Sequence, residues 1–227
     1  MSGDGFGAEV LVLPVGREAL LVELSSGEHA EAFRVELLRR HARGELPAIR
    51  EIVPGARSVL LDGIADHTRE MRVRFARELA SWRTPLPMRS GARDAVEIPV
   101  VYDGPDLAEV ATAWGVGVDE VPGIHAGTEF RVAFCGFAPG FGCLTGLPGH
   151  LHAPRRTTPR TKVPAGAVAL AGPYTGVYPR ASPGGWQLIG RMPNPEELWD
   201  PVREPAALLM PGARVRFVVA GAAGVAE

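Results

Sequence analysis

The first part of the chain contains short runs in which apolar residues alternate with polar ones or follow one another, as they do in strands. These runs predict strands at residues 9–13, 19–24, 49–53 and 58–61. Apolar residues at helical spacing predict one helix from Ser25, which with Glu28 fits a capping box, to Gly44, and another at 65–82. The order strand-strand-helix-strand-strand-helix is typical of a small α+β domain with helices on one face of a mostly antiparallel sheet.

The pattern changes after residue 84. Thr84-Pro85-Leu86-Pro87 is a stiff break, and most of the 28 glycines and 21 prolines follow it. Strands are expected at 96–102, 130–134, 163–171, 186–190 and 214–219, and short helices at 106–114 and 118–125. Pro/Gly turns at such intervals are typical of a small β-barrel or sandwich. We therefore predict two domains, residues 1–90 and 91–227, the first α+β and the second mainly β.

Composition supports a folded, soluble protein, because 46% of the residues are apolar and 22% are charged. No run is long and apolar enough for a membrane helix, and residues 1–10 lack the features of a signal peptide, so the cytoplasm is the expected compartment. The two cysteines, Cys135 and Cys143, have no CxxC or regular histidine spacing around them. We expect two thiols, with no disulfide framework and no metal site.

Charge is distributed unevenly along a chain whose formal net charge is only -2. Between residues 125 and 191 the sole carboxylate is Glu129, and seven cations accompany it: Arg131, Arg155, Arg156, Arg160, Lys162, Arg180 and Arg191. Guanidinium groups bind planar oxyanions through two hydrogen bonds, so the segment predicts a site for a small carboxylated or phosphorylated molecule. A basic surface face or a contact with an acidic partner protein are the alternatives. Nucleic acid is disfavoured, because the nearby aromatic residues form no recognisable stacking motif.

A segment so poor in carboxylates leaves histidines as the candidates for acid–base chemistry. His125 precedes the glycine-rich loops, whereas His150 and His152 lie in a Pro/Gly segment. A structural histidine is the alternative for His125. The sequence has no GxxxxGK[ST], GxGxxG, HExxH or GxSxG motif, so ATP chemistry would need an unusual site or another protein chain.

Two loops, at residues 137–141 and 182–186, combine glycine, proline and aromatic residues. Their glycines permit close approach of a ligand, and their amides could hold an oxyanion. The alternative is that both loops are corners of a barrel.

Motifs in and around these loops resemble the allophanate hydrolase subunit 1 family, which includes the B subunit of 5-oxoprolinase, sporulation-kinase inhibitors and part of the carboxyltransferase region of urea carboxylase. They are Gly136-Phe137-Ala138-Pro139-Gly140-Phe141, Leu147-Pro148, Pro154-Arg155-Arg156, Pro159-Arg160, Val163-Pro164-Ala165-Gly166, Thr175-Gly176-Val177-Tyr178-Pro179, Ser182-Pro183-Gly184-Gly185-Trp186 and Ile189-Gly190-Arg191. Cys143 stands where the family usually has an aromatic residue, and Met192 where it usually has threonine.

The resemblance implies a cyclophilin-like β-barrel for the second domain. It also implies a partner, either an allophanate hydrolase subunit 2-like protein or the C subunit of 5-oxoprolinase. The activity that it implies is ATP-dependent opening of 5-oxoproline to glutamate, with ATP used by the complex and a small anionic substrate. By resemblance, the catalytic candidates are His125, Arg160 and Arg191. The substrate-binding candidates are Phe137, Pro139, Gly140, Phe141, Arg155, Tyr178, Ser182, Gly184, Gly185 and Trp186.

Two other functions stay open at this point: inhibition of a histidine kinase, and carboxyl transfer in a biotin-dependent complex of the urea carboxylase type. The cations themselves give a geometric expectation. Arg155, Arg160 and Arg191 should converge on one cleft with His125 and the 182–186 loop, because clustered positive charge is tolerated best where an anion or an acidic partner compensates it.

Overall fold

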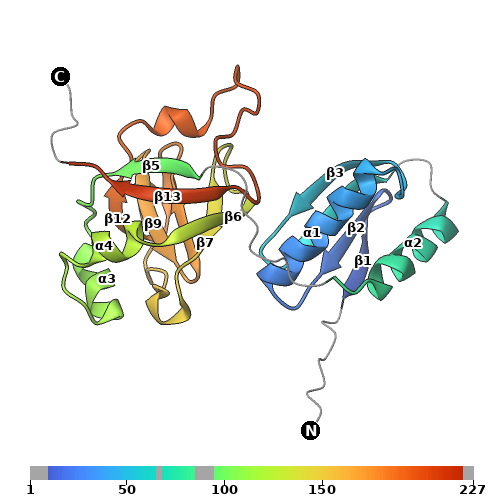
Figure 1. Cartoon of the computed structure of the whole chain (residues 1–227), viewed down its shortest axis with the longest axis horizontal. Coiled ribbons are helices and arrows are strands. Elements are labelled where there is room, and N and C mark those ends of the chain that lie inside the picture. The colour runs from blue at the N-terminus through green and yellow to red at the C-terminus, as the bar shows by residue number, and fades with distance from the viewer. Residues whose placement is uncertain (1–9, 65–67, 85–94, 222–227) are drawn as a thin grey trace, which may run out of the picture. The chain divides into compact units, whose positions relative to one another are not determined.

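The computed structural model describes residues 10–64, 68–84 and 95–221 (Figure 1). Contacts divide the chain into two compact units, residues 1–90 (unit 1) and 91–227 (unit 2). None of the described helices is long and apolar enough to cross a membrane. The predicted boundary between residues 90 and 91 lies outside the described residues.

Unit 1 is a four-stranded antiparallel sheet with two helices, in the predicted order of elements. The strands are β1 (Leu11–Val15), β2 (Ala19–Glu23), β3 (Ile49–Pro54) and β4 (Ser58–Ile64), arranged β1-β2-β4-β3. Helix α1 spans Gly27–Ala42 and α2 spans Arg69–Ser81. The cap of α1 lies one residue later than predicted, since the Ser26 hydroxyl accepts the His29 amide at 3.2 Å. Of the predicted second helix, residues 65–67 lie outside the described part.

Both helices cover one face of this sheet. Every second residue of β2 and β4 is buried in a core that also contains residues of α1 and α2: Leu20, Val22, Val59, Leu61, Phe33, Leu37, Phe75 and Leu79. Trp82, which follows α2, packs against Phe33 with ring centroids 5.2 Å apart. The alternation read in the sequence therefore sets the buried face of the sheet.

Unit 2 is built around a seven-stranded sheet in the order β12-β9-β10-β7-β6-β13-β5. Its strands are β5 (Val96–Val100), β6 (Glu129–Cys135), β7 (Gly142–Thr145), β9 (Ala167–Ala171), β10 (Tyr174–Val177), β12 (Gln187–Arg191) and β13 (Arg214–Val219). Neighbours run antiparallel except β13 and β5, which are parallel. A bridge between Val101 and Arg191 joins the end of β5 to β12, so the sheet is nearly closed into a barrel.

Shorter elements complete unit 2. Strands β8 (Arg160–Val163) and β11 (Ser182–Gly184) form a separate ribbon. Helices α3 (Leu107–Trp114) and α4 (Val121–Ala126) contribute Val110, Trp114 and Val121 to the barrel core, and the 3₁₀ turns are η1 (Gly149–Leu151) and η2 (Pro195–Leu198).

One strand prediction in unit 2 is wrong. Residues 163–171 are not a single strand, because β8 ends at Val163 and β9 begins at Ala167. Between them Gly166 adopts φ +80°, and a Cβ there would lie 2.5 Å from the Met192 carbonyl oxygen. The chain turns at a position that only glycine fits.

Candidate functional site

Four aromatic rings of unit 2 form one cluster at the glycine-rich loops. Phe141 lies 5.2 Å from Tyr178 and 5.5 Å from Trp186, and Phe137 lies 5.4 Å from Phe141, all in edge-to-face geometry. Phe141, Tyr178 and Trp186 are buried, whereas Phe137 is 66% exposed. The cluster thus has a buried floor and one ring in contact with solvent.

Glycines bring these loops close to the rings. A Cβ at Gly184 would lie 2.3 Å from the Tyr178 hydroxyl oxygen, and one at Gly140, where φ is +81°, would lie 2.9 Å from the Leu198 carbonyl oxygen. Phe137 adopts φ +68°, a conformation that a non-glycine residue holds only at a cost. The loop backbone is therefore strained at the residue whose ring is exposed.

The other loop residues of the predicted set lie around the cluster. Pro139 is exposed beside Phe137, and Ser182 begins β11, where its hydroxyl donates to the Arg180 carbonyl oxygen at 3.1 Å. Gly185 accepts the Arg156 amide at 2.8 Å, which ties the 154–160 segment to the loop before Trp186. The structure brings together the ten predicted substrate-binding residues; it does not test their role.

Arg155 is the cation that faces the aromatic cluster. Its guanidinium carbon lies 5.9 Å from the Trp186 ring centroid, and the residue is exposed. Burial raises the pKa of Tyr178, and the positive charge of Arg155 opposes that rise. Within residues 10–64, 68–84 and 95–221, no carboxylate forms an ion pair with Arg155. Its hydrogen-bond donors are available to an incoming oxyanion.

Asp106 compensates two of the other arginines. The carboxylate is 2% exposed, and its Oδ1 accepts Arg156 Nη1 at 2.9 Å and Arg160 Nη2 at 2.6 Å. Its Oδ2 accepts the Leu188 amide at 2.6 Å, so one side chain joins the start of α3, the 154–160 segment and β12. Sequence spacing gives no sign of this pairing, because Asp106 lies 50 positions before Arg156 and outside the cation-rich segment 125–191.

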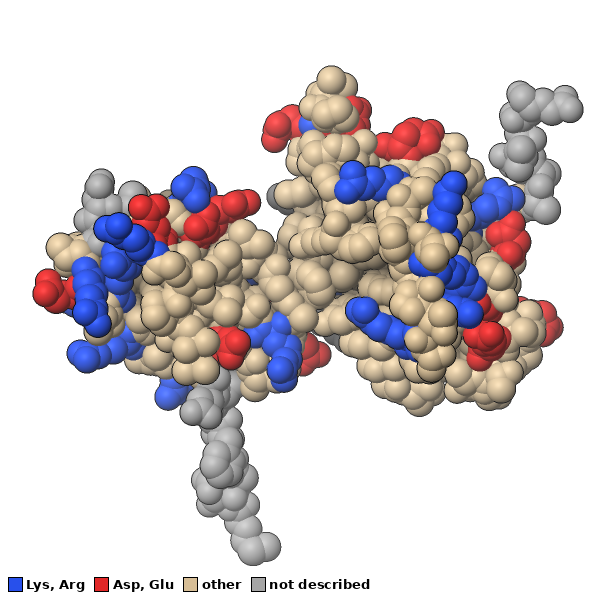
Figure 2. All heavy atoms as spheres, turned by 180° about the vertical axis from the view of Figure 1, so that it is seen from behind, with Lys and Arg blue, Asp and Glu red and all other residues tan. Residues whose placement is uncertain are grey.

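Arg191 occupies an exposed position at the end of β12. Its Nε donates to Asp103 at 2.8 Å, and the two side chains are 44% and 47% exposed. The predicted cation segment is therefore neutralised in part by aspartates from the 102–106 stretch. On the face of unit 2 drawn in Figure 2, blue and red side chains likewise lie next to each other.

His125 does not open onto a cleft, so the expected convergence is wrong at this residue. The imidazole is 0% exposed and lies between the rings of Phe130, at 4.9 Å, and Phe217, at 4.5 Å. Its ring nitrogens contact the hydroxyls of Tyr102, at 2.8 Å, and Thr175, at 3.5 Å. Burial lowers the pKa of His125 to about 3, so the ring is neutral at physiological pH. These contacts favour the structural alternative for this histidine.

Cys143 is also poorly suited to nucleophilic chemistry. Burial raises the pKa of its thiol to about 12, so the thiolate is scarce at neutral pH. Among the residues that the structure describes, no group of three or more His, Cys, Asp or Glu side chains is placed to hold a metal ion.

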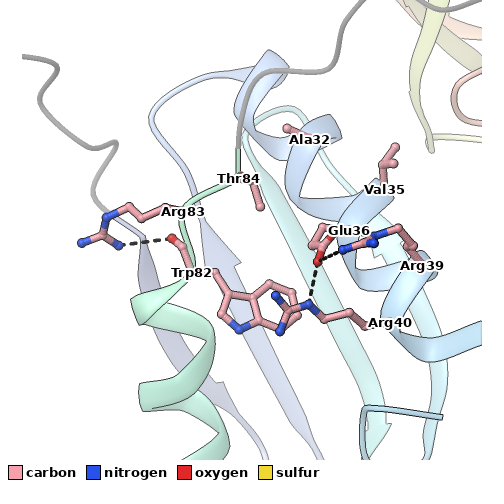
Figure 3. Close-up of a pocket in the computed structure, with 8 residues that line it drawn as sticks. All are labelled: Ala32, Val35, Glu36, Arg39, Arg40, Trp82, Arg83 and Thr84. Atoms are coloured by element: carbon pink, nitrogen blue, oxygen red, sulfur yellow. Dashed lines mark hydrogen bonds and ion pairs between the residues drawn. The ribbon is translucent and has the colours of Figure 1, made fainter. Parts of the chain in front are cut away.

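A hollow of about 440 Å³ lies on unit 1, between α1 and the segment after α2 (Figure 3). Arg40 lies over the Trp82 ring at 4.1 Å, and Glu36 accepts from Arg39 at 2.7 Å and from Arg40 at 2.6 Å. Hydrogen bonds from these two arginines lower the pKa of Glu36 to about 2. Two of the three arginines that line the hollow are therefore paired with Glu36, and the third, Arg83, donates to the backbone carbonyl oxygens of Ser81 and Trp82.

Comparison with known proteins gives a family match over most of the chain. The model of the carboxyltransferase domain, subdomain C and D, matches residues 10–209. A protein named as the B subunit of 5-oxoprolinase, from Escherichia coli O157:H7, is 42% identical over 177 residues, which cover 77% of this chain and 79% of the relative. A protein of the same name from Bacillus subtilis strain 168 is 48% identical over 129 residues, 56% of this chain and 53% of that protein.

Two solved structures share the fold. TTHA0988 superposes with a TM-score of 0.72 at 35% identity, covering 93% of this chain and 41% of that longer chain. Kluyveromyces lactis urea carboxylase superposes with a TM-score of 0.67 at 19% identity, covering 93% of this chain and 22% of the enzyme. At that identity the second match shows the fold alone.

Proposed function

The chain belongs to the family of the carboxyltransferase domain, subdomain C and D, and from this premise we propose that it is the B subunit of a 5-oxoprolinase complex. The observation that carries the proposal is the relative of that name from Escherichia coli, which aligns over more than three quarters of both chains. The reaction of the complex is the opening of the 5-oxoproline lactam to glutamate, driven by ATP hydrolysis. The partner is the C subunit of the same complex.

The aromatic cluster and Arg155 suit a small, ring-shaped carboxylate. In this proposal the carboxylate of the substrate binds the Arg155 guanidinium through paired hydrogen bonds, and its apolar ring atoms lie against the exposed Phe137 side chain. Amides of the 136–141 and 182–186 loops supply further donors. The site recognises a negative charge beside an apolar surface.

The same site is poor in acid–base groups. His125 is buried and neutral, and the Asp106 carboxylate is already bound by two guanidiniums and an amide. Arg160 is a candidate for stabilising negative charge on the reacting amide, since Asp106 fixes its orientation. Arg191, paired with Asp103 at an exposed position, is the weaker catalytic candidate. We therefore place the proton transfers and the ATP site on the partner proteins.

Reconstitution tests the function. The chain is co-expressed with the C subunit and with the third component that the family resemblance implies for the oxoprolinase complex, both from the same genome. Glutamate release from 5-oxoproline is followed with and without ATP. We expect release only from the full complex with ATP. Release that is absent from the full complex, or unchanged when this chain is omitted, would falsify the assignment.

Carboxyl transfer is a second candidate, favoured by the family match and by the shared fold of urea carboxylase. Transfer of a carboxyl group from carboxybiotin to urea by a complex containing this chain, without 5-oxoproline activity, would select it. Kinase inhibition stays a prediction of the resemblance alone, and a test of autophosphorylation with the purified chain addresses it.

A further inference from the structure

The loop at residues 199–207 of unit 2 presents apolar side chains to solvent. Val202 is 92% exposed and Trp199 is 41% exposed, and Pro201 and Pro205 are exposed near them. Large apolar side chains left in water together mark interaction sites, and tryptophan is enriched among the residues that dominate binding energy. The loop thus has the composition of a binding surface.

Hydrogen bonds from its backbone and from two of its side chains hold this loop in one shape. A bridge joins Trp199 to Ala207, and the Asp200 amide donates to the Ala206 carbonyl oxygen at 3.0 Å. Arg203 donates to three carbonyl oxygens, those of Pro205 at 3.2 Å, Glu197 at 3.0 Å and Ala206 at 2.9 Å. The Val202 amide donates to Asp200 Oδ1 at 3.0 Å. A surface held in one shape before binding loses little conformational entropy when a partner docks.

Carboxylates surround the apolar tip. Residues 196–204 contain the acidic side chains of Glu196, Glu197, Asp200 and Glu204, and their one cation, Arg203, is bound to backbone carbonyls. Figure 2 shows red atoms beside the tan projection at the top of unit 2, the segment that also projects in Figure 1. The surface is an apolar centre with a negative rim, which a partner with an apolar pocket and a positive rim complements.

We propose that the 199–207 loop is the docking surface for the C subunit, and that this partner offers an apolar pocket rimmed by Lys or Arg. The choice of partner rests on the proposed function. Two other occupants fit less well. A second copy that docked through the same loop would bring carboxylates against carboxylates, and an anionic membrane would repel them. The arginine-rich 154–160 segment, in contrast, is tied to Asp106 within unit 2.

Binding of the purified C subunit to the full chain tests the proposal. Val202→Asp places a charge at the apolar tip without touching the core, and we expect it to raise the Kd at least tenfold. The matched control is Val118→Asp on the same unit, where the valine is 47% exposed, and its Kd should stay within twofold of wild type. Arg203→Ala loosens the loop and should raise the Kd about fivefold with Val202 intact. Wild-type association should slow as salt is added.

Three results would overturn the docking surface. Val202→Asp could bind the C subunit as tightly as wild type; if the complex still releases glutamate, the proposed function survives and only the surface is wrong. Wild type could fail to bind the C subunit at all, and a lack of glutamate release would then count against the function as well. Sedimentation could show a wild-type dimer that Val202→Asp dissociates, which would identify a second copy as the occupant.

Discussion

Replacing Asp106 with alanine removes the carboxylate that joins three parts of unit 2. The variant leaves the guanidiniums of Arg156 and Arg160 without their shared counter-charge and leaves the buried Leu188 amide without its acceptor. Arg160 and the Leu188 amide lose this partner completely, and Arg156 keeps only a 3.5 Å contact with the exposed Glu109, so we expect a large fall in the free energy of unfolding.

The magnitude follows from burial. Removing one partner of a buried ion pair costs about 3–5 kcal/mol, and an unpaired buried amide costs about 1–3 kcal/mol. The Arg156 and Arg160 side chains are 28% and 23% exposed, so water recovers part of their solvation when Asp106 is absent. We therefore expect a total loss of about 4 kcal/mol, near the lower end of the two costs combined.

Urea unfolding followed by tryptophan fluorescence measures this loss. Trp82→Phe is introduced into every chain compared, because the remaining tryptophans, Trp114, Trp186 and Trp199, all belong to unit 2. The control is Asp103→Ala, which breaks an exposed pair and should cost less than about 1 kcal/mol. Equal losses in the two variants, or a loss below about 1 kcal/mol for Asp106→Ala, would refute the reasoning from burial.

The remaining predictions concern charge, substrate binding and backbone strain. Because its pKa is lowered to about 2, Glu36 contributes stability that is present above its ordinary pKa of 4.5 and is lost as the pH falls toward 2. Acid unfolding of Glu36→Gln should show a shallower pH dependence over that window than wild type, and identical profiles would contradict this. In the reconstituted complex, Arg155→Ala should raise KM for 5-oxoproline at least tenfold with a smaller change in kcat. The exposed control Arg180→Ala should change neither constant. A fall in kcat alone for Arg155→Ala would count against a binding role. In thermal unfolding, Phe137→Gly should be more stable than Phe137→Ala by about 1 kcal/mol, because both variants lack the ring and only glycine tolerates φ +68° freely. A more stable alanine variant would show that the backbone relaxes.

The sequence was most informative where structure is local. Alternation in the strands and helical spacing around Phe33 and Phe75 predicted every helix and strand that the structure describes in unit 1, because adjacent segments pair there and one face is buried. In unit 2 the short strands β7, β10 and β11 were not singled out. They contain glycine, their burial is nearly continuous in β7 and β10, and no alternation marks them.

The sequence predicted which loop residues lie together at the candidate site, whose binding role stays a prediction, but it did not predict the electrostatics. The rings and glycines of the two loops could be found because they recur in the family motifs, and they do lie together. The role of Asp106 could not be read from spacing, because its pairing with Arg160 spans 54 positions and depends on how the barrel closes. The burial of His125 was missed for the same reason: Phe217, which contacts its ring, lies on β13.

Strand β5 depends on a part of the chain that is synthesised much later. It pairs along its length with β13, from Val96 opposite Val215 to Val100 opposite Val219. In the described residues its only other strand contact is the single bridge between Val101 and Arg191, although Ile98 and Val100 are buried. In unit 1, by contrast, β1 pairs with β2 and β3 with β4 as soon as each hairpin exists. Contacts between distant segments are slow to form. During translation, the apolar edge of β5 therefore stays unpaired until residue 219 has emerged, and we expect unit 2 to be the part of the nascent chain that is more prone to aggregation.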